Sequence, residues 1–217
     1  ISADWCSEWI ERDCGGLRAI ELGAGTGLFT RHLALRGFDS LLATDKSKQM
    51  LEEGRKRLPM VEWAELDAWG CETASIDRIY ASSLLQWAHD PVSVLKNWRN
   101  ALELKGRVLV CLYIEGSLEE FVKERPDFSA LQWRSELEWL GFFREAGFDV
   151  SRSESRDDVI SYASSREALR AIHDLGAIEE RRMSPGELKR FLNDCDRRFE
   201  NRFGLSWKTL KIECVNR

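Results

Sequence analysis

Short hydrophobic runs alternate with segments of helical spacing through the first half of the chain. Runs of this length, bounded by glycine or polar turn residues, are typical of parallel strands that are buried on both faces. Strands that alternate with helices in this way indicate an α/β fold with a doubly wound sheet. We predict five such strands, at residues 17–22, 40–44, 61–66, 75–83 and 107–114.

Helix signals lie between these strands. Residues 28–36 have apolar positions at helical spacing, and Gly37 is a residue type that is favoured just after a helix. A second helix is expected to begin near Ser47. A third is expected to begin at Asp90–Pro91, because proline suits the first helical position, and to end at Lys105–Gly106.

The second half of the chain carries four helix-start signals of the capping-box type, in which a serine is followed three residues later by Glu or Gln. These signals begin at Ser117, Ser129, Ser164 and Ser184. We therefore expect helical additions at residues 117–147 and 164–202, over the substrate side of the sheet. No repeat or low-complexity linker divides the chain, so one domain is expected over residues 1–217.

Two further strands are predicted in this half. Residues 148–162 are read as a strand with a polar interruption at 151–158. Residues 205–215 alternate between apolar and polar side chains, a pattern typical of a strand near a sheet edge with one more exposed face.

The first hydrophobic run leads into a turn with glycine at three alternate positions. Gly23, Gly25 and Gly27 let backbone N–H groups approach a ligand with no Cβ in the way, and a helix start nearby favours an anionic group. The dinucleotide fingerprint would require a third glycine at position 28, which is Leu28. The spacing is G-x-G-x-G, with Glu21 two residues before it; the alternative is an ordinary glycine-rich turn.

Asp45 ends the second predicted strand, 22 residues after Gly23. This interval is close to that at which an acid meets a ribose in nucleotide-binding βαβ units, where a carboxylate can accept from two vicinal hydroxyls. The alternative is that Asp45 caps the following helix.

These motifs resemble the class I S-adenosylmethionine-dependent methyltransferases, whose first motif is (D/E)-x-G-x-G-x-G. The resemblance implies a Rossmann-like, seven-stranded mixed sheet with helices on both faces and the last strand antiparallel near one edge. It implies S-adenosyl-L-methionine as cofactor and S-adenosyl-L-homocysteine as product. Asp67 would accept from the adenine amino group beside Trp69, or else is a solvated turn residue. The implied cofactor residues are Glu21, Gly23, Ala24, Gly25, Gly27, Asp45, Lys46, Asp67, Ala68 and Ser82.

A narrower resemblance is to the malonyl-[acyl-carrier protein] O-methyltransferases of biotin synthesis. It implies methyl transfer to the free carboxyl of a malonyl thioester, with malonyl-acyl carrier protein or malonyl-CoA as partner. That family has an N-terminal segment with an aromatic residue, and this chain begins after it; 174–176 departs from the usual pattern. The resemblance rests on residues 84–87, 115–120, 168–177, 183–188 and 205–209.

A carboxylate is already anionic at neutral pH, so the reaction needs positioning more than a general base. Arg170 is the first candidate to orient the carboxylate and Arg125 the second, although either could be a surface helix residue. Trp87 could shape the methyl-transfer cavity or anchor the core. The basic residues Lys189, Arg190, Arg197 and Arg198 could dock an acidic carrier.

Charge is spread unevenly along the chain. Residues 181–217 hold ten Lys or Arg and five Asp or Glu, against 32 and 37 in the whole chain, which leaves a net charge of −10 before residue 181. A basic end on an acidic protein suits an acidic partner or is a solvated helix face.

Six scattered cysteines without a C-x-x-C pair indicate reduced thiols in a cytoplasmic protein, and no metal-ligand spacing is present. We expect a monomer that binds neither nucleic acid nor membrane. The alternatives are another small-molecule O- or C-methyltransferase, a non-catalytic cofactor-binding protein of this fold, and a nucleotide-binding oxidoreductase domain.

Overall fold

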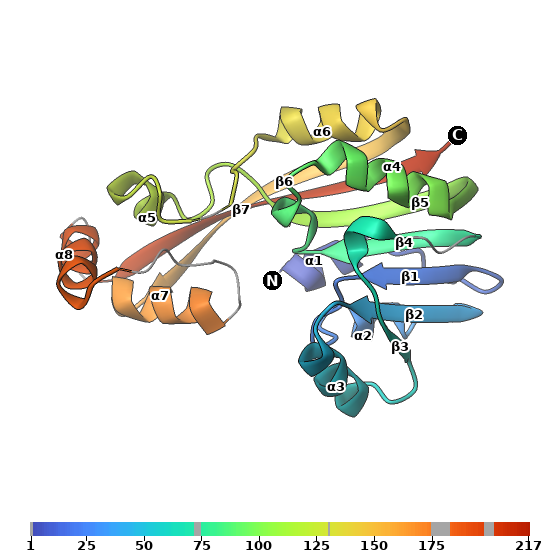
Figure 1. Cartoon of the computed structure of the whole chain (residues 1–217), viewed down its shortest axis with the longest axis horizontal. Helices are drawn as coiled ribbons and strands as arrows, with labels where there is room; N and C mark the ends of the chain where they lie inside the picture. The colour runs from blue at the N-terminus through green and yellow to red at the C-terminus, as the bar shows by residue number, and fades with distance from the viewer. Residues whose placement is uncertain (1, 72–74, 130, 175–182, 198–201) are drawn as a thin grey trace. The chain divides into compact units, whose positions relative to one another are not determined.

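The computed structural model describes residues 2–71, 75–129, 131–174, 183–197 and 202–217 (Figure 1). The chain divides into two compact units. The sheet unit comprises residues 1–112, 134–155 and 210–217, and the helical unit comprises 113–133 and 156–209. Part of the predicted addition at 117–147 therefore belongs to the sheet unit.

The strands form one seven-stranded mixed sheet with the order β3-β2-β1-β4-β5-β7-β6 (Figure 1). Neighbours among the first five strands pair in parallel, whereas β7 is antiparallel. This topology confirms the predicted fold class. The strands are β1 (Arg18–Leu22), β2 (Ser40–Asp45), β3 (Glu62–Glu65), β4 (Ile76–Ser82), β5 (Leu102–Tyr113), β6 (Phe148–Tyr162) and β7 (Phe203–Asn216).

Helices of the sheet unit connect and cover these strands. Ser47 caps α3 and Asp90 caps α4, each by accepting a backbone N–H, as the sequence predicts. The α-helices are α1 (Ser2–Ser7), α2 (Thr30–Leu33), α3 (Lys48–Arg57), α4 (Pro91–Ala101) and α6 (Glu136–Glu145); the short 3₁₀ helices are η1 (Ala68–Gly70) and η2 (Leu85–Trp87).

The helical unit contains α5 (Glu119–Glu124), α7 (Ser165–Asp174) and α8 (Pro185–Asp196) around an aromatic core. The ring of Phe121 stacks on that of Phe203, with 5.1 Å between centroids, and Phe128 stacks on Phe191 at 5.4 Å. Aromatic pairs at such distances stabilise a core beyond the apolar area that they bury.

Two helix boundaries differ from the prediction. The helix expected over 28–36 is reduced to α2, because the glycine turn continues as far as Phe29. The helix from Asp90 ends at Ala101 rather than at Lys105–Gly106. Leu102 is already extended and pairs with β4, and Lys105 adopts a positive φ within β5.

Two of the four predicted capping boxes are wrong. Ser117 donates its hydroxyl to the Lys208 carbonyl instead of capping α5, and Ser129 closes a turn by accepting the Leu131 N–H. Ser184 forms the complete box with Glu187, as predicted. A box that the prediction missed, Ser135 with Glu138, begins α6.

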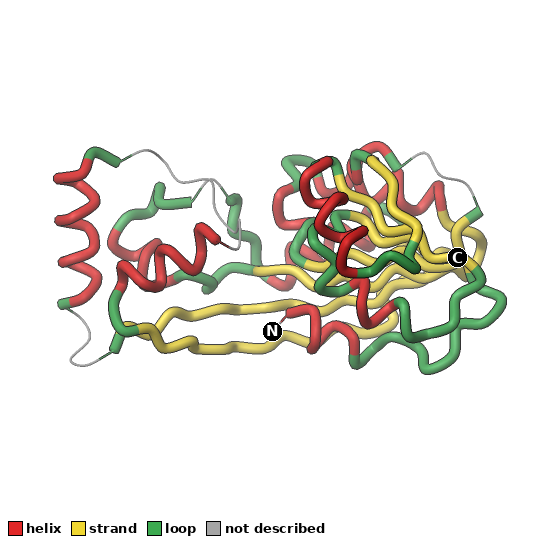
Figure 2. Tube along the Cα trace, turned by 90° about the horizontal axis from the view of Figure 1, so that it is seen from below, coloured by secondary structure: helices red, strands yellow, loops and turns green. Residues whose placement is uncertain are grey.

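The two C-terminal strands, β6 and β7, are the longest and lie side by side (Figures 1 and 2). β6 runs unbroken through its charged stretch, because it is the edge strand and its side chains reach solvent. The predicted exposed face of β7 is wrong. Lys211 is 0% exposed, with Nζ within 4.3 Å of the ring centroids of Trp5 and Trp9 and donating to the Trp5 carbonyl at 3.1 Å.

Gly54→Ala is expected to destabilise the protein, although alanine is the better helix former. A Cβ at Gly54 in α3 would lie 2.3 Å from the Cη2 atom of the buried Trp63 ring. Such overpacking costs about 1–3 kcal/mol, which exceeds the gain in helix propensity of about 1 kcal/mol. Chemical denaturation measures the difference. Gly141→Ala in α6 is the matched control, since its Cβ would meet nothing within 4 Å; equal effects of the two changes would contradict the packing argument.

Candidate functional site

The glycine turn follows β1 directly, and all three of its glycines adopt positive φ: 68° at Gly23, 56° at Gly25 and 89° at Gly27. The sequence analysis expects the turn's N–H groups to face a ligand. In the structure, Ala24 donates to the Thr44 carbonyl at 2.7 Å, and Gly27 donates to the Ala24 carbonyl at 3.0 Å. These bonds fix the turn against the end of β2.

Gly25 differs from its neighbours in the space around it. A Cβ on Gly23 would lie 2.7 Å from a methyl group of Leu84, and one on Gly27 would lie 3.2 Å from Leu58 and Trp63. A Cβ on Gly25 would meet nothing within 4 Å. Gly25 is therefore the position in the turn where a ligand could approach the backbone closely.

Asp45 lies at the carboxyl end of β2 and contacts the same turn. Its Oδ2 accepts the Gly25 N–H at 2.9 Å, and its Oδ1 accepts the Ser47 N–H at 2.8 Å. Because Ser47 is the residue that caps α3, Asp45 is not the helix cap. Each carboxylate oxygen can accept a further hydrogen bond, so the side chain can still bind two hydroxyl groups. Lys46 beside it is exposed.

Glu21 is the most deeply buried charged group of this region, with 1% of its surface exposed. Burial raises the pKa of its carboxyl from 4.5 to about 8; the nearby Thr30 hydroxyl lowers the pKa in part, and the charge of Asp45 raises it further. Among the residues that the structure describes, no donor reaches Oε2 of Glu21. A buried acceptor without a donor is costly, so this atom fits the positive group of a bound ligand.

The third strand end contributes Asp67 and Ala68. Asp67 is exposed and accepts the Trp69 N–H at 3.0 Å, which begins η1. The Ala68 carbonyl is occupied by the indole N–H of Trp98 at 2.7 Å. Ser82, partly buried, is the last residue of β4. The roles of these residues toward an adenine remain predictions.

The structure thus brings Glu21, the glycine turn and Asp45 together at the carboxyl ends of adjacent parallel strands. Ligands of open α/β sheets bind at these ends. Trp87 lies in η2 of the sheet unit, three residues after the Leu84 side chain that packs on Gly23. Gln86 in the same helix is 6% exposed, and no donor within the described part of the chain reaches its Oε1.

The sequence reading did not assign Leu84 or Gln86 a role. Both lie in the 84–87 patch that carries the narrower resemblance, and that patch was the available signal.

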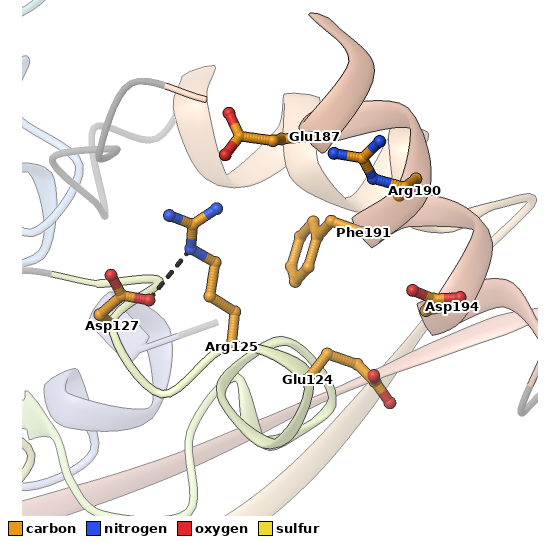
Figure 3. A pocket seen from close by; sticks show the side chains of 7 residues that line it. All are labelled: Glu124, Arg125, Asp127, Glu187, Arg190, Phe191 and Asp194. Carbon is orange, nitrogen blue, oxygen red and sulfur yellow. Dashed lines mark hydrogen bonds and ion pairs between the residues drawn. The ribbon is translucent and has the colours of Figure 1, made fainter. Parts of the chain in front are cut away.

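Arg170 and Arg125 lie in the helical unit. Arg170 is exposed on α7. Arg125 lines a pocket of about 410 Å³, where its Nε donates to Asp127 at 3.0 Å (Figure 3). Two guanidinium groups and four carboxylates line this pocket, a formal charge of −2, with the Phe191 ring between them. The lining residues are Glu124, Arg125, Asp127, Glu187, Arg190, Phe191 and Asp194.

Two searches of the described ranges were negative. No group of three or more His, Cys, Asp or Glu side chains there could hold a metal ion. None of the described helices has the length and hydrophobicity that a bilayer crossing requires.

Curated relatives carry two kinds of name. The chain is 28% identical over 170 residues to a malonyl-[acyl-carrier protein] O-methyltransferase of Halorhodospira halophila, which covers 74% of this chain and 58% of the relative. It is 42% identical over 80 residues to a trans-aconitate 2-methyltransferase of Methylobacterium radiotolerans, which covers 36% of this chain and 30% of the relative. The chain therefore spans less than two thirds of the length of either protein.

The fold and a family model agree with these relatives. An S-adenosylmethionine-dependent methyltransferase of Mesorhizobium loti has the same fold, with a TM-score of 0.62 at 17% identity over 98% of this chain and 97% of that one. The model described as "Methyltransferase domain" matches residues 20–110, which include the glycine turn, Asp45 and Asp67. Residues 20–110 thus belong to the methyltransferase domain family, whose cofactor here is S-adenosylmethionine.

Proposed function

We propose that this protein transfers a methyl group from S-adenosylmethionine to the free carboxyl of a malonyl thioester carried by acyl carrier protein, as a step toward biotin. The observation that carries a carboxylate acceptor is that both groups of relatives are named for acids, malonyl and trans-aconitate. The cofactor supplies an activated methyl on a sulfonium, which a carboxylate oxygen can displace to give an ester and S-adenosylhomocysteine. No proton has to be removed from the acceptor at neutral pH.

The residues at the strand ends would hold the cofactor. Gly25 gives the amino-acid tail room beside the backbone, and Asp45 has acceptor capacity for both ribose hydroxyls. Glu21 offers an unsatisfied buried oxygen to a cationic group. Held in this way, the donor needs only an in-line acceptor and the exclusion of water.

A cation should orient the acceptor without quenching it. Arg170 remains the first candidate, because no ion pair between it and another described residue occupies its guanidinium. Arg125 is less suited, since Asp127 already pairs with it and the pocket around it is negatively charged overall. Trp87, half-buried beside the loop that contacts Gly23, would shape the cavity for the methyl group.

The carrier would dock on the basic side chains of α8 and its end. Lys189 and Arg190 are exposed there, which supports the proposal. Arg197 is exposed but pairs with Asp194 at 2.9 Å, which reduces its contribution. Arg198 and the patch at 175–177 lie outside the described residues.

A second candidate acceptor is a small free polycarboxylate such as trans-aconitate, favoured by the 42% identity over 80 residues. Mass spectrometry after incubation with S-adenosylmethionine separates the two. Methyl ester on malonyl-carrier protein or malonyl-CoA supports the first function, and ester on trans-aconitate alone supports the second. Cofactor binding without ester on any of these acids would contradict both and indicate a non-catalytic binder.

Asp45→Ala is expected to weaken cofactor binding by about 1.5–3 kcal/mol, the scale of hydrogen bonds to a charged group. Isothermal titration calorimetry with S-adenosylhomocysteine measures the loss. Because Asp45 also accepts the N–H groups of Gly25 and Ser47, Asp45→Asn serves as the control that keeps an acceptor in place. Unchanged affinity in both variants would remove the ribose role.

Reversal of Arg197 and Arg198 to Glu is expected to raise KM for malonyl-carrier protein by roughly 3–10-fold at low salt, because like charges would then face the acidic carrier. KM for malonyl-CoA should not change. Steady-state kinetics with both substrates gives the comparison, and a parallel rise in both constants would count against docking at this helix.

A further inference from the structure

Glu21 combines burial, missing hydrogen bonds and a position at the cofactor turn. Its carboxyl is 1% exposed in the middle of the sheet, where β1 pairs with both β2 and β4. Neither Oε2 of Glu21 nor the buried hydroxyl of Thr30 has a hydrogen-bond partner among the described residues. An ionised carboxylate in such a place lacks compensation unless a cation approaches it.

The groups around Glu21 offer no such cation. Asp45 faces it from β2 as a second negative charge, and the neutral Cys6 thiol faces it from α1. Tyr80 is its register partner on β4. Lys211, which also acts on Cys6, directs its Nζ to Glu8 and Glu154 instead. The empty turn therefore favours the neutral acid, in agreement with the raised pKa of Glu21.

We infer that Glu21 binds a proton when the turn holds no cofactor and releases it to solvent when a cationic ligand enters, so that cofactor binding is coupled to the release of one proton. The inference rests on the placement of the cofactor at this turn. The balance is simple: the O–H bond of the carboxyl breaks, the proton goes to buffer, and the carboxylate remains opposite the positive group of the ligand. No redox partner is needed.

The coupling predicts that affinity rises with pH while Glu21 is protonated in the free protein. For a group with a pKa of about 8, the apparent Kd should fall roughly ninefold from pH 6 to pH 7 and by less than twofold from pH 8 to pH 9. Glu21→Gln, which cannot ionise, should lose this dependence.

Isothermal titration calorimetry of S-adenosylmethionine in phosphate and in Tris at pH 7 counts the released protons, because the two buffers have different ionisation enthalpies. The ligand's own amino group titrates near this pH, so the quantity tested is the difference between wild type and Glu21→Gln. About 0.9 more proton released by the wild type is expected. A difference near zero, with cofactor heat still observed, would overturn the inference, whereas the absence of any binding heat would overturn the cofactor site itself.

A second measurement covers the case in which Glu21→Gln does not fold. Infrared difference spectra of the wild type, with and without S-adenosylmethionine, report the protonated carboxyl band directly. Loss of that band on binding, with a matching gain in carboxylate absorption, is expected. A spectrum in which the carboxyl band is unchanged by saturating ligand would contradict the proton release.

Discussion

Gly25→Val is expected to lower the affinity for S-adenosylmethionine by at least about 100-fold while the protein stays folded. The valine side chain would fill the open space beside this backbone position, which is where the ligand has to approach. The positive φ of 56° adds a local strain of about 1–2 kcal/mol, which is a fraction of the stability of a typical domain. Calorimetry measures the affinity, and thermal unfolding reports whether the fold survives.

Gly16→Val is the matched control for this change. Gly16 also has a positive φ, 79°, and a Cβ there would also meet nothing within 4 Å, but it lies in the loop before β1. The same strain is therefore introduced away from the turn, and affinity should be unchanged. Equal losses of affinity in the two variants would show that strain, rather than obstruction of the ligand, explains the Gly25 result.

Glu21 is expected to make the protein less stable as pH rises from about 4.5 to about 8. Its pKa in the folded protein is raised, so folding favours the protonated form. The favourable contribution is fully present below the unfolded pKa of 4.5 and is lost as pH rises through 8. The free energy of unfolding should fall by about 1.4 kcal/mol per pH unit in this window, or roughly 4–5 kcal/mol in total.

Chemical denaturation of wild type and Glu21→Gln across this pH range tests the expectation. The variant should be the less pH-dependent of the two, because glutamine does not titrate. Saturating S-adenosylmethionine should also reduce the wild-type slope, because the bound cation would stabilise the ionised carboxylate. Parallel pH profiles for both proteins would show that Glu21 is not the group responsible.

Much of the candidate site could be predicted because its residues follow strand ends directly. Glu21, Gly25 and Asp45 lie at the carboxyl ends of two hydrophobic runs, and adjacent parallel strands bring these ends together. Sequence spacing could not show that the Gly25 N–H donates to Asp45, nor that Leu84 packs on Gly23. Both contacts join segments that are distant in sequence.

Local helix signals were less reliable in the second half of the chain. Ser117 and Ser184 carry the same capping pattern, yet only Ser184 caps a helix. The hydroxyl of Ser117 donates to the Lys208 carbonyl, and its oxygen accepts the Lys208 N–H, so it is occupied by β7. A local preference worth about 1 kcal/mol is easily outweighed by such tertiary contacts.

The sequence by itself determined the seven strands, their parallel order in the first half and the glycine turn with its two acids. It could do so because hydrophobic runs and glycine spacing are local properties of the chain. Only the tertiary structure decided that Lys211 is buried between two tryptophan rings and that Glu21 lacks a partner for Oε2. Burial and partnership depend on residues far apart in sequence, and it is these that set the charge state of Glu21.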